Sequence, residues 1–239
     1  MTTKCEVVVA PLATLQQQLR QLVQEAAQRA LAEGRRVSVA IPGGSVATQL
    51  LSALRADDID WGASDVFWCD ERAVAPTHPD SNYGTSVAGW LAALVGSGIR
   101  LHRMHGDAPS LDDAARRYDE ELSSSLGLSP RLDLAIVGVG EDGHVCSLFP
   151  GHPALREADR LAVAVRDAPK PPTDRLTLTL PFVAASRLVV VAALGASKAG
   201  AMRAALSDTP GTTPVAQLLQ LTERAVVLLD LEAARDLGR

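Results

Sequence analysis

The clearest pattern in the chain is a run near its amino end in which apolar residues recur every three or four positions. Its members are Leu15, Leu19, Leu22, Val23, Ala26, Ala27, Ala30 and Leu31. This spacing predicts an amphipathic α-helix, and Gly34 stands where a C-terminal cap is expected.

Short, continuous apolar runs follow along the rest of the chain. They cover residues 36–41, 65–69, 132–137, 188–194 and 225–229. Runs of this length and composition are typical of buried parallel strands. Residues 175–180, RLTLTL, alternate strictly between apolar and polar, which predicts an edge or antiparallel strand.

Helical patterns separate most of these strands. They cover residues 46–55 and 83–95, and residues 114–126 after a capping-box sequence that begins at Ser110. Strands alternating with helices predict an α/β fold of the doubly wound, Rossmann-like type, with helices on both faces of a mostly parallel sheet. Since no linker, repeat or shift in composition interrupts the pattern, we expect residues 1–239 to form a single domain.

Composition and charge narrow the function. Hydrophobic residues make up 47% of the chain but aromatic residues only 3%, so Ala, Val and Leu must fill the core. The net charge of −5 has the wrong sign for bulk binding to nucleic acid, and an anionic small ligand would need a local cationic pocket. The amino terminus lacks a signal sequence and no apolar stretch approaches a membrane span, so we expect a cytoplasmic protein.

The cysteine pattern indicates neither disulfides nor a metal site. Cys5, Cys69 and Cys146 are odd in number, far apart and not in C-x-x-C pairs. We therefore expect reduced thiols and no metal.

Four segments that directly follow predicted strands carry unusual chemistry. They are residues 42–45 (PGGS), 70–72 (DER), 138–144 (GVGEDGH) and 195–198 (GASK). In open α/β sheets ligands bind outside the carboxyl ends of the strands, so these segments are expected to share one edge of the sheet.

The glycine loop Gly43-Gly44-Ser45 precedes a predicted helix, whose free backbone N–H groups could bind a phosphate. A tight turn in which Ser45 is a plain N-cap fits the same residues equally well. A serine-hydrolase elbow does not fit, because G-x-S-x-G needs a glycine where this chain has Ala47.

Residues 138–143 match G-x-G-x-x-G, the fingerprint of dinucleotide binding. Glu141 and Asp142 would place two carboxylates where a pyrophosphate must approach, and Pro150 and Pro153 interrupt the helix that should follow. The glycines are better explained as a tight loop around an acid and a histidine.

His144 is the candidate general base, because histidine exchanges protons near neutral pH and Asp142 is close enough in sequence to orient it. A loop histidine bonded to backbone is the alternative. A dyad with Cys146 is less favoured than simple packing of that thiol. The other histidines with a structural interpretation are His102, His105 and His152.

Three cations are candidates to bind an anion. Arg72 follows a strand, Lys198 precedes a predicted helix, and Arg175 follows the stretch KPPTD. Each alone also fits an ordinary surface cation. The polar loop 73–84 fits a plain loop of turn-forming residues.

Taken together, these residues resemble a known family, the 6-phosphogluconolactonases, within the wider fold group of the glucosamine-6-phosphate deaminases. The resemblance rests on residues 42–45, on WCDERAVAPTHPDSNYG at 68–84, on LDLAIVGVGEDGHVCSLFPG at 132–151, and on Arg175 and Lys198. The DER and DGH…SLFPG blocks are specific, since the deaminases typically have a tyrosine after the acidic pair and Asn-Glu-Pro after DGH.

The chain departs from the family pattern in a few places. Val46 and Ala47 stand where Thr-Pro is common, which removes a threonine hydroxyl from the glycine loop. Val139, Val145 and Cys146 replace residues often seen as Met, Thr and Ala, and these are interpreted as packing changes.

The resemblance implies a deaminase-type fold and hydrolysis of 6-phospho-D-glucono-1,5-lactone to 6-phosphogluconate in the oxidative pentose phosphate pathway, without metal or other cofactor. His144 would activate water and Asp142 would orient its ring. The implied substrate-binding residues are Gly43, Gly44, Ser45, Asp70, Arg72, Arg175 and Lys198. The expected partner is the small sugar-phosphate lactone, with no nucleic acid or membrane, and the expected state is a monomer or weak homodimer.

Two other functions stay open. A deaminase or isomerase acting on glucosamine 6-phosphate would use Asp70 to shuttle a proton and His144 to assist ring opening. A non-enzymatic sugar-phosphate sensor would need an attached DNA-binding segment, and we expect none before Val7 or after Leu237.

Overall fold

A twisted sheet of parallel strands forms the centre of the computed structural model, which describes residues 4–94, 96–207, 209 and 211–238. Its strands, in spatial order, are β1 (Lys4–Val9), β10 (Arg224–Leu229), β9 (Val189–Ala193), β6 (Leu134–Gly138), β2 (Val37–Ile41), β3 (Ser64–Trp68) and β5 (Arg100–His102). Every neighbouring pair is parallel, which confirms the predicted sheet.

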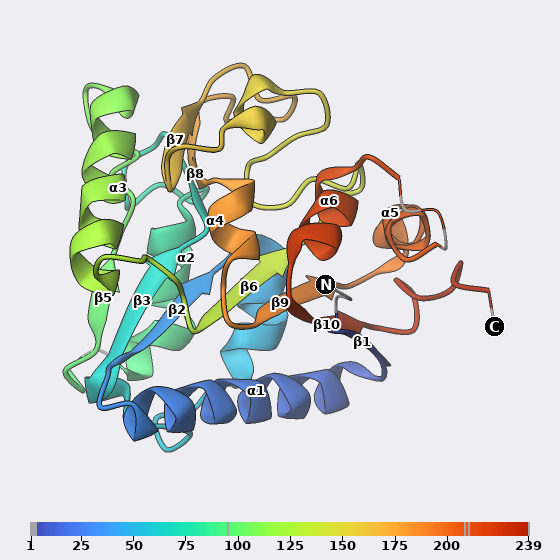
Figure 1. Ribbon diagram of the computed structural model, residues 1–239, viewed down its shortest axis with the longest axis horizontal. Helices are drawn as coiled ribbons and strands as arrows, with labels where there is room; N and C mark the ends of the chain where they lie inside the picture. The colour runs from blue at the N-terminus through green and yellow to red at the C-terminus, as the bar shows by residue number, and fades with distance from the viewer. Residues whose placement is uncertain (1–3, 95, 208, 210, 239) are drawn as a thin grey trace.

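Helices cover both faces of this sheet, as predicted (Figure 1). The α-helices are α1 (Leu12–Ala32), α2 (Asn82–Ala88), α3 (Leu111–Leu126), α4 (Leu180–Ala184), α5 (Ala199–Ala205) and α6 (Pro214–Leu221). The shorter helical turns are η1 (Val46–Leu50), η2 (Leu51–Ala53), η3 (Trp61–Ala63), η4 (Trp90–Ala93), η5 (Pro153–Arg156) and η6 (Ala196–Lys198). In the part of the chain that the structure describes, no helix combines the length and the apolar character needed to cross a bilayer.

The core is divided into two layers because successive strand residues point to opposite faces of the sheet. In β9, Val189 and Val191 pack on one side with α3, α4, α5 and α6, and Val190 packs on the other side with α1. All three valines are fully buried. A strand buried on both faces cannot alternate with polar residues, which is why the sequence shows continuous apolar runs.

The predicted C-terminal cap of α1 is confirmed. Gly34 adopts a φ of +68°, its N–H donates to the carbonyl of Leu31, and the N–H of Arg35 donates to the carbonyl of Ala30. This pair of bonds is a Schellman motif, which favours glycine because a Cβ is disfavoured at positive φ.

A second sheet lies beside the first and consists of β4 (Asp70–Arg72), β8 (Arg175–Leu178) and β7 (Ala162–Val165). Both of its pairings are antiparallel, which confirms the prediction from the alternating segment RLTLTL. Residues 70–72, expected from the sequence only as a segment that follows a strand, themselves form the strand β4. They form a strand because Arg72 and Asp70 pair with Arg175 and Thr177, a long-range contact that local sequence does not show.

The helix predicted over residues 46–55 forms differently from an α-helix. It consists of the π turn η1 followed by the 3-10 turn η2, and Ser45 makes no side-chain capping bond. The turns pack against α1 and bury Val46, Ala47, Leu50 and Leu51 together, so packing sets their form.

Other boundaries differ as well. The helix predicted over 83–95 is interrupted at Gly89, so that α2 ends at Ala88 and η4 follows; residue 95 lies outside the described residues. The sequence pattern also missed β1, β5, β7, α4 and α6, which are short or lie at sheet edges, and the strand predicted over 175–180 ends at Leu178.

The order of the strands in the large sheet indicates where a ligand can bind. The chain runs outward from β2 through β3 to β5, then returns to β6 and continues in the opposite direction through β9 to β10. The order therefore reverses between β2 and β6, and the loops after these two strands diverge to leave a crevice at their carboxyl ends.

Candidate active site

A pocket of about 200 Å³ opens at this point of reversal. Eight of the residues singled out from the sequence line it, namely Gly43, Gly44, Ser45, Asp70, Arg72, His144, Arg175 and Lys198. Asp142 does not line the pocket, but its Oδ1 is hydrogen-bonded to Nδ1 of His144. The expectation that the segments after the strands share one edge of the sheet is confirmed.

His144, which lines the pocket, forms a close hydrogen-bonded pair with Asp142. Nδ1 of His144 lies 2.5 Å from Oδ1 of Asp142. A carboxylate only accepts hydrogen bonds, so Nδ1 carries a hydrogen, and in the neutral ring Nε2 then has the lone pair that can take a proton. Burial raises the pKa of Asp142, but the hydrogen bond and charge of His144 outweigh it, and the net pKa lies below its usual range.

The loop around this pair requires its glycines. A Cβ on Gly140 would overlap Nδ1 of His144, and a Cβ on Gly143, whose φ is +81°, would lie 2.8 Å from Cβ of Thr213. Gly140 also donates its N–H to the carbonyl of His144. The G-x-G-x-x-G match is thus explained by close packing around an imidazole, as the sequence suggested.

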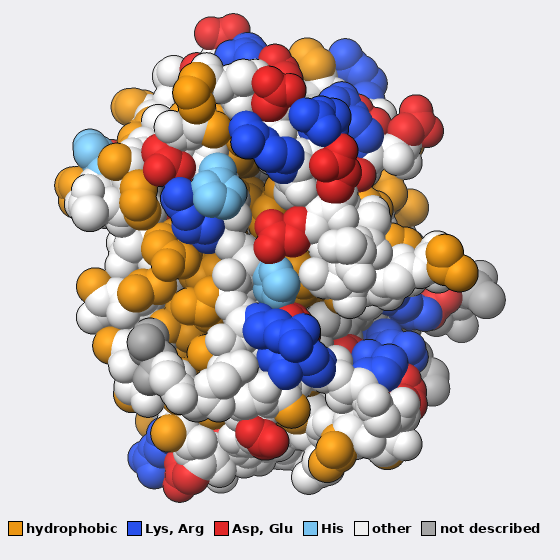
Figure 2. All heavy atoms as spheres, turned by 90° about the vertical axis from the view of Figure 1, so that its left-hand side faces the viewer, with side chains coloured by type: hydrophobic (Ala, Val, Ile, Leu, Met, Phe, Trp, Pro, Cys, Tyr) orange, Lys and Arg blue, Asp and Glu red, His pale blue; other side chains and the backbone are white. Residues whose placement is uncertain are grey.

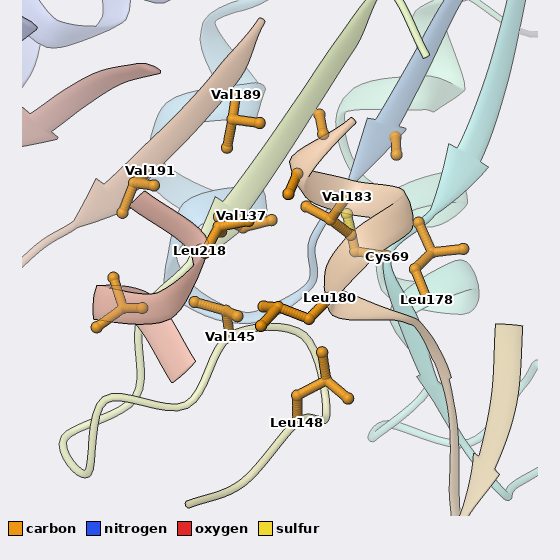
Figure 3. Packing of buried hydrophobic residues seen from close by; sticks show 14 of the residues in the cluster. Cys69, Val137, Val145, Leu148, Leu178, Leu180, Val183, Val189, Val191 and Leu218 are labelled. Carbon is orange, nitrogen blue, oxygen red and sulfur yellow. The ribbon is translucent and has the colours of Figure 1, made fainter. Parts of the chain in front are cut away.

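Apolar side chains anchor the same loop to the core. Val145 and Leu148 are fully buried and lie among residues of β6 and α4, including Val137 and Leu180 (Figure 3). Next to them, the ring of Phe149 lies 4.5 Å from the ring of His144. The imidazole is therefore held by a hydrogen bond on one side and by packing on another.

The cations of the pocket are held in different ways. Arg72 donates from Nη1 to the carbonyl of Asp80, while its Nε is buried without a hydrogen-bond partner among the described residues. Lys198 lies 3.9 Å from the exposed carboxylate of Glu141, a weak contact. Among the described residues, neither side chain is held in a close ion pair that an anionic ligand would have to break.

Arg175 is fixed more firmly. Its Nε donates to the carbonyl of Pro172, its Nη2 to that of Lys170, and its guanidinium lies over the ring of Phe149. Burial lowers the pKa of Arg175 and the nearby Asp70 opposes this effect; the net pKa lies below its usual range. The guanidinium contributes a buried positive charge at one wall of the pocket.

Glu71, the middle residue of the acidic strand, organises the start of α2. Its carboxylate accepts from the backbone N–H groups of Arg72, Asn82 and Tyr83 and from the hydroxyl of Ser81. Burial raises its pKa despite these bonds. An acid at a helix start satisfies N–H groups that lack helical partners, so the role of Glu71 is structural.

Sequence reasoning missed several residues of the pocket. Asn82 was interpreted as part of a plain loop, yet it is buried, lines the pocket and touches Gly43 so closely that a Cβ there would overlap its Oδ1. Lys170 also lines the pocket. Lys170 begins the stretch KPPTD that precedes Arg175, and this closeness in sequence could have identified it as a pocket residue. Cys146, interpreted as packing, lines the pocket too, with a φ of +54°.

His102, His105 and His152 do not line this pocket, in agreement with their structural interpretation. Within the described ranges, no group of three or more His, Cys, Asp or Glu side chains is arranged to hold a metal ion.

An imidazole–carboxylate pair beside several cations, at the strand ends of a doubly wound sheet, defines an enzyme-like site for a small anionic ligand. The family model described as glucosamine-6-phosphate isomerases/6-phosphogluconolactonase matches residues 11–228, and the chain belongs to this family.

Individual relatives point to one branch of the family. The chain is 36% identical to the 6-phosphogluconolactonase of Rattus norvegicus, over 91% of this chain and 87% of that protein. It is 34% identical to a protein of Drosophila melanogaster named probable 6-phosphogluconolactonase, over 93% and 91%. Among solved structures, that of 6-phosphogluconolactonase from Trypanosoma brucei superposes with a TM-score of 0.85 at 26% identity, over 99% of this chain and all of that one.

Proposed function

We propose that this protein hydrolyses 6-phospho-D-glucono-1,5-lactone to 6-phosphogluconate, the lactone-opening step of the oxidative pentose phosphate pathway. The observation that carries the proposal is the His144–Asp142 pair at a pocket lined by Arg72, Lys170, Arg175 and Lys198. Relatives named as lactonases, which match nearly the whole chain, support the same activity.

In the proposed reaction, Nε2 of His144 takes a proton from water, and the water oxygen attacks the lactone carbonyl. The resulting tetrahedral intermediate collapses by breaking the bond between the carbonyl carbon and the ring oxygen, and that oxygen receives the proton from His144. Asp142 keeps the imidazole in the required tautomer and stabilises its positive form. The acid produced loses a proton to solvent at neutral pH, so turnover releases acid.

The cations and the glycine loop would bind the phosphate and stabilise negative charge on the carbonyl oxygen. Arg72 supports this role, because it lines the pocket and its guanidinium makes no ion pair among the described residues. Gly43, Gly44 and Ser45, which also line the pocket, would contribute backbone N–H groups.

A direct test is acid release from freshly generated lactone, measured in a pH-stat against the spontaneous rate. His144→Ala is expected to lower kcat by about 10²- to 10⁴-fold and to leave 6-phosphogluconate binding in place. His105→Ala, which changes a histidine outside the pocket, is the matched control. Retention of full turnover by His144→Ala would remove His144 from the mechanism.

Arg72→Ala tests anion binding. Loss of a charge-assisted contact worth about 1.5–3 kcal/mol is expected to raise KM by roughly 10- to 150-fold. Arg116→Ala, on an exposed face of α3, should leave KM unchanged. A normal affinity in the Arg72 variant would show that Arg72 does not touch the substrate.

The deaminase alternative is tested by ammonia release from glucosamine 6-phosphate in the same preparation. That reaction would need Asp70 as a proton carrier, yet both of its carboxylate oxygens already accept hydrogen bonds from Asn82 and Ser147. Lactone hydrolysis is therefore the function that the site supports better. Ammonia release without lactone hydrolysis would reverse this conclusion.

We further propose a single domain over residues 1–239, because Leu176 and Leu178 of the small sheet share one core cluster with Val137 of the large sheet. A cytoplasmic location and a monomer or weak homodimer complete the proposal. Fractionation of cells and sedimentation of the purified protein would test them.

A further inference from the structure

A buried hydrogen-bonded chain runs beneath the pocket and joins segments that are distant in sequence. Ser147 Oγ lies 2.6 Å from Oδ2 of Asp70, and Nδ2 of Asn82 lies 3.1 Å from Oδ1 of Asp70. On the far side of the serine, Nη1 of Arg175 donates to Ser147 Oγ at 3.4 Å. The two ends of the chain, Asn82 and Arg175, both line the pocket.

The donors and acceptors fix the direction of these bonds. A guanidinium and an amide NH₂ only donate, so Ser147 Oγ accepts from Arg175 and gives its own hydrogen to Asp70. Asp70 is thereby an acceptor at both oxygens. Each oxygen keeps a second lone pair, but protonating Asp70 would weaken both buried bonds and remove the negative charge beside the buried guanidinium of Arg175.

Burial makes the arrangement rigid. Asp70 is 5% exposed, Asn82 3%, Arg175 4% and Ser147 0%. Breaking one bond in such a network leaves a polar group unsatisfied away from water, which costs more than the net value of the bond. The negative charge of Asp70 also compensates the buried positive charge of Arg175.

The chain reaches the glycine loop as well. Asn82 Oδ1 occupies the space where a Cβ of residue 43 would lie, so the position of the amide and that of Gly43 depend on each other. The bond from Nδ2 to Asp70 sets the position of this amide. The carboxylate of Asp70 thus aligns two parts of the pocket. It positions the glycine loop through Asn82 and the guanidinium of Arg175 through Ser147.

We propose that Asp70 is a positioning residue, held by Ser147 and Asn82, that aligns Arg175 and the glycine loop for the substrate anion and takes no proton in the reaction. This inference rests on the proposed lactonase function for its kinetic readout. It gives Ser147 the function of linking Asp70 to Arg175.

The test compares Asp70→Asn, Ser147→Ala and the double variant. Each single change is expected to raise KM for the lactone by roughly tenfold, to change kcat by less than about threefold, and to leave the pH profile of kcat unchanged. Ser186→Ala is the matched control, because Ser186 is also fully buried but its hydroxyl has no partner among the described residues. It should leave KM unchanged.

Because the two residues belong to one network, the double variant should raise KM no more than about the larger single effect. Additive effects would overturn the network. If Asp70→Asn turns over slower by about two orders of magnitude or more at unchanged KM, or loses one ionisation from its pH profile, Asp70 transfers a proton and the proposal is overturned.

Binding of 6-phosphogluconate, measured by calorimetry on the same variants, separates this inference from the proposed function. Wild-type protein that binds the product but does not open the lactone would overturn the proposed function. The affinities of the wild type, the two single variants and the double variant for the product would still test the network. If Asp70→Asn does not fold, Ser147→Ala alone decides, since it leaves the acid in place and removes one donor. An unchanged affinity in Ser147→Ala would overturn the proposal.

Discussion

His102 should make the stability of this protein depend on pH in the alkaline range. Its Nε2 lies 2.8 Å from Asp65 and its Nδ1 lies 2.7 Å from Glu121. Carboxylates only accept hydrogen bonds, so both ring nitrogens must donate and the ring must be the imidazolium. The surface on the side of α3 and β5 mixes acidic, basic and histidine side chains (Figure 2).

The size of the effect follows from the change in pKa between the unfolded and folded states. Burial lowers the pKa of His102, but the bonds to Asp65 and Glu121 outweigh this and raise it from 6.5 to about 9. At about 1.4 kcal/mol per pKa unit, this corresponds to on the order of 3 kcal/mol. Because the folded pKa is the higher one, the stabilisation is fully present below about pH 6.5 and is lost as the pH rises through about 9.

The assay is urea unfolding of the wild type and of His102→Gln at pH 6, 8 and 10. Comparing the two proteins cancels the other groups that titrate in this range, such as Cys69, whose pKa burial raises. The difference in unfolding free energy should shrink by on the order of 3 kcal/mol from pH 6 to pH 10. A wild-type advantage that stays constant across this range would refute an imidazolium at position 102.

Three further predictions concern the pocket. Gly140→Ala should lower kcat by about 10²-fold with product binding retained, because its Cβ would displace the ring of His144; an unchanged kcat in the lactone assay would contradict the close packing. Asp142→Asn should lower kcat by about 10²- to 10⁴-fold, because an amide can stabilise the wrong tautomer of the imidazole, and an equal effect on KM alone would argue for binding instead. Gly43→Ala should raise KM roughly tenfold by displacing Asn82, whereas a matched Gly-to-Ala change in α5, at residue 200, meets no atom within 4 Å and should leave KM alone.

The parallel sheet and its long helices were predictable because their signal is local. In α1, burial of one face imposes a three-to-four residue spacing, and in β9, burial of both faces imposes a continuous apolar run. The loops that carry the pocket could be located for the same reason, since parallel strands bring their carboxyl ends to one edge. His144 and Asp142, two residues apart, could be paired from sequence alone.

Long-range pairing decided the rest. The strand β4 exists because it meets β8, about a hundred residues later, and the local sequence DER carries no strand pattern. The same pairing places Arg72 beside Arg175 and brings Lys170 to the pocket. The local sequence around a surface cation does not differ from that around a cation at a binding site, so only the fold distinguishes the two.

The sequence by itself thus determined the class of fold, the edge of the sheet where a ligand binds and the candidate base His144. Only the tertiary structure showed that Asp70 is occupied at both oxygens, because its partners Asn82 and Ser147 lie 12 and 77 residues away. Hydrophobic periodicity reports the environment of a residue relative to its neighbours in the chain. The chemical state of a buried acid depends on which donors reach it, and the packing of distant segments decides that.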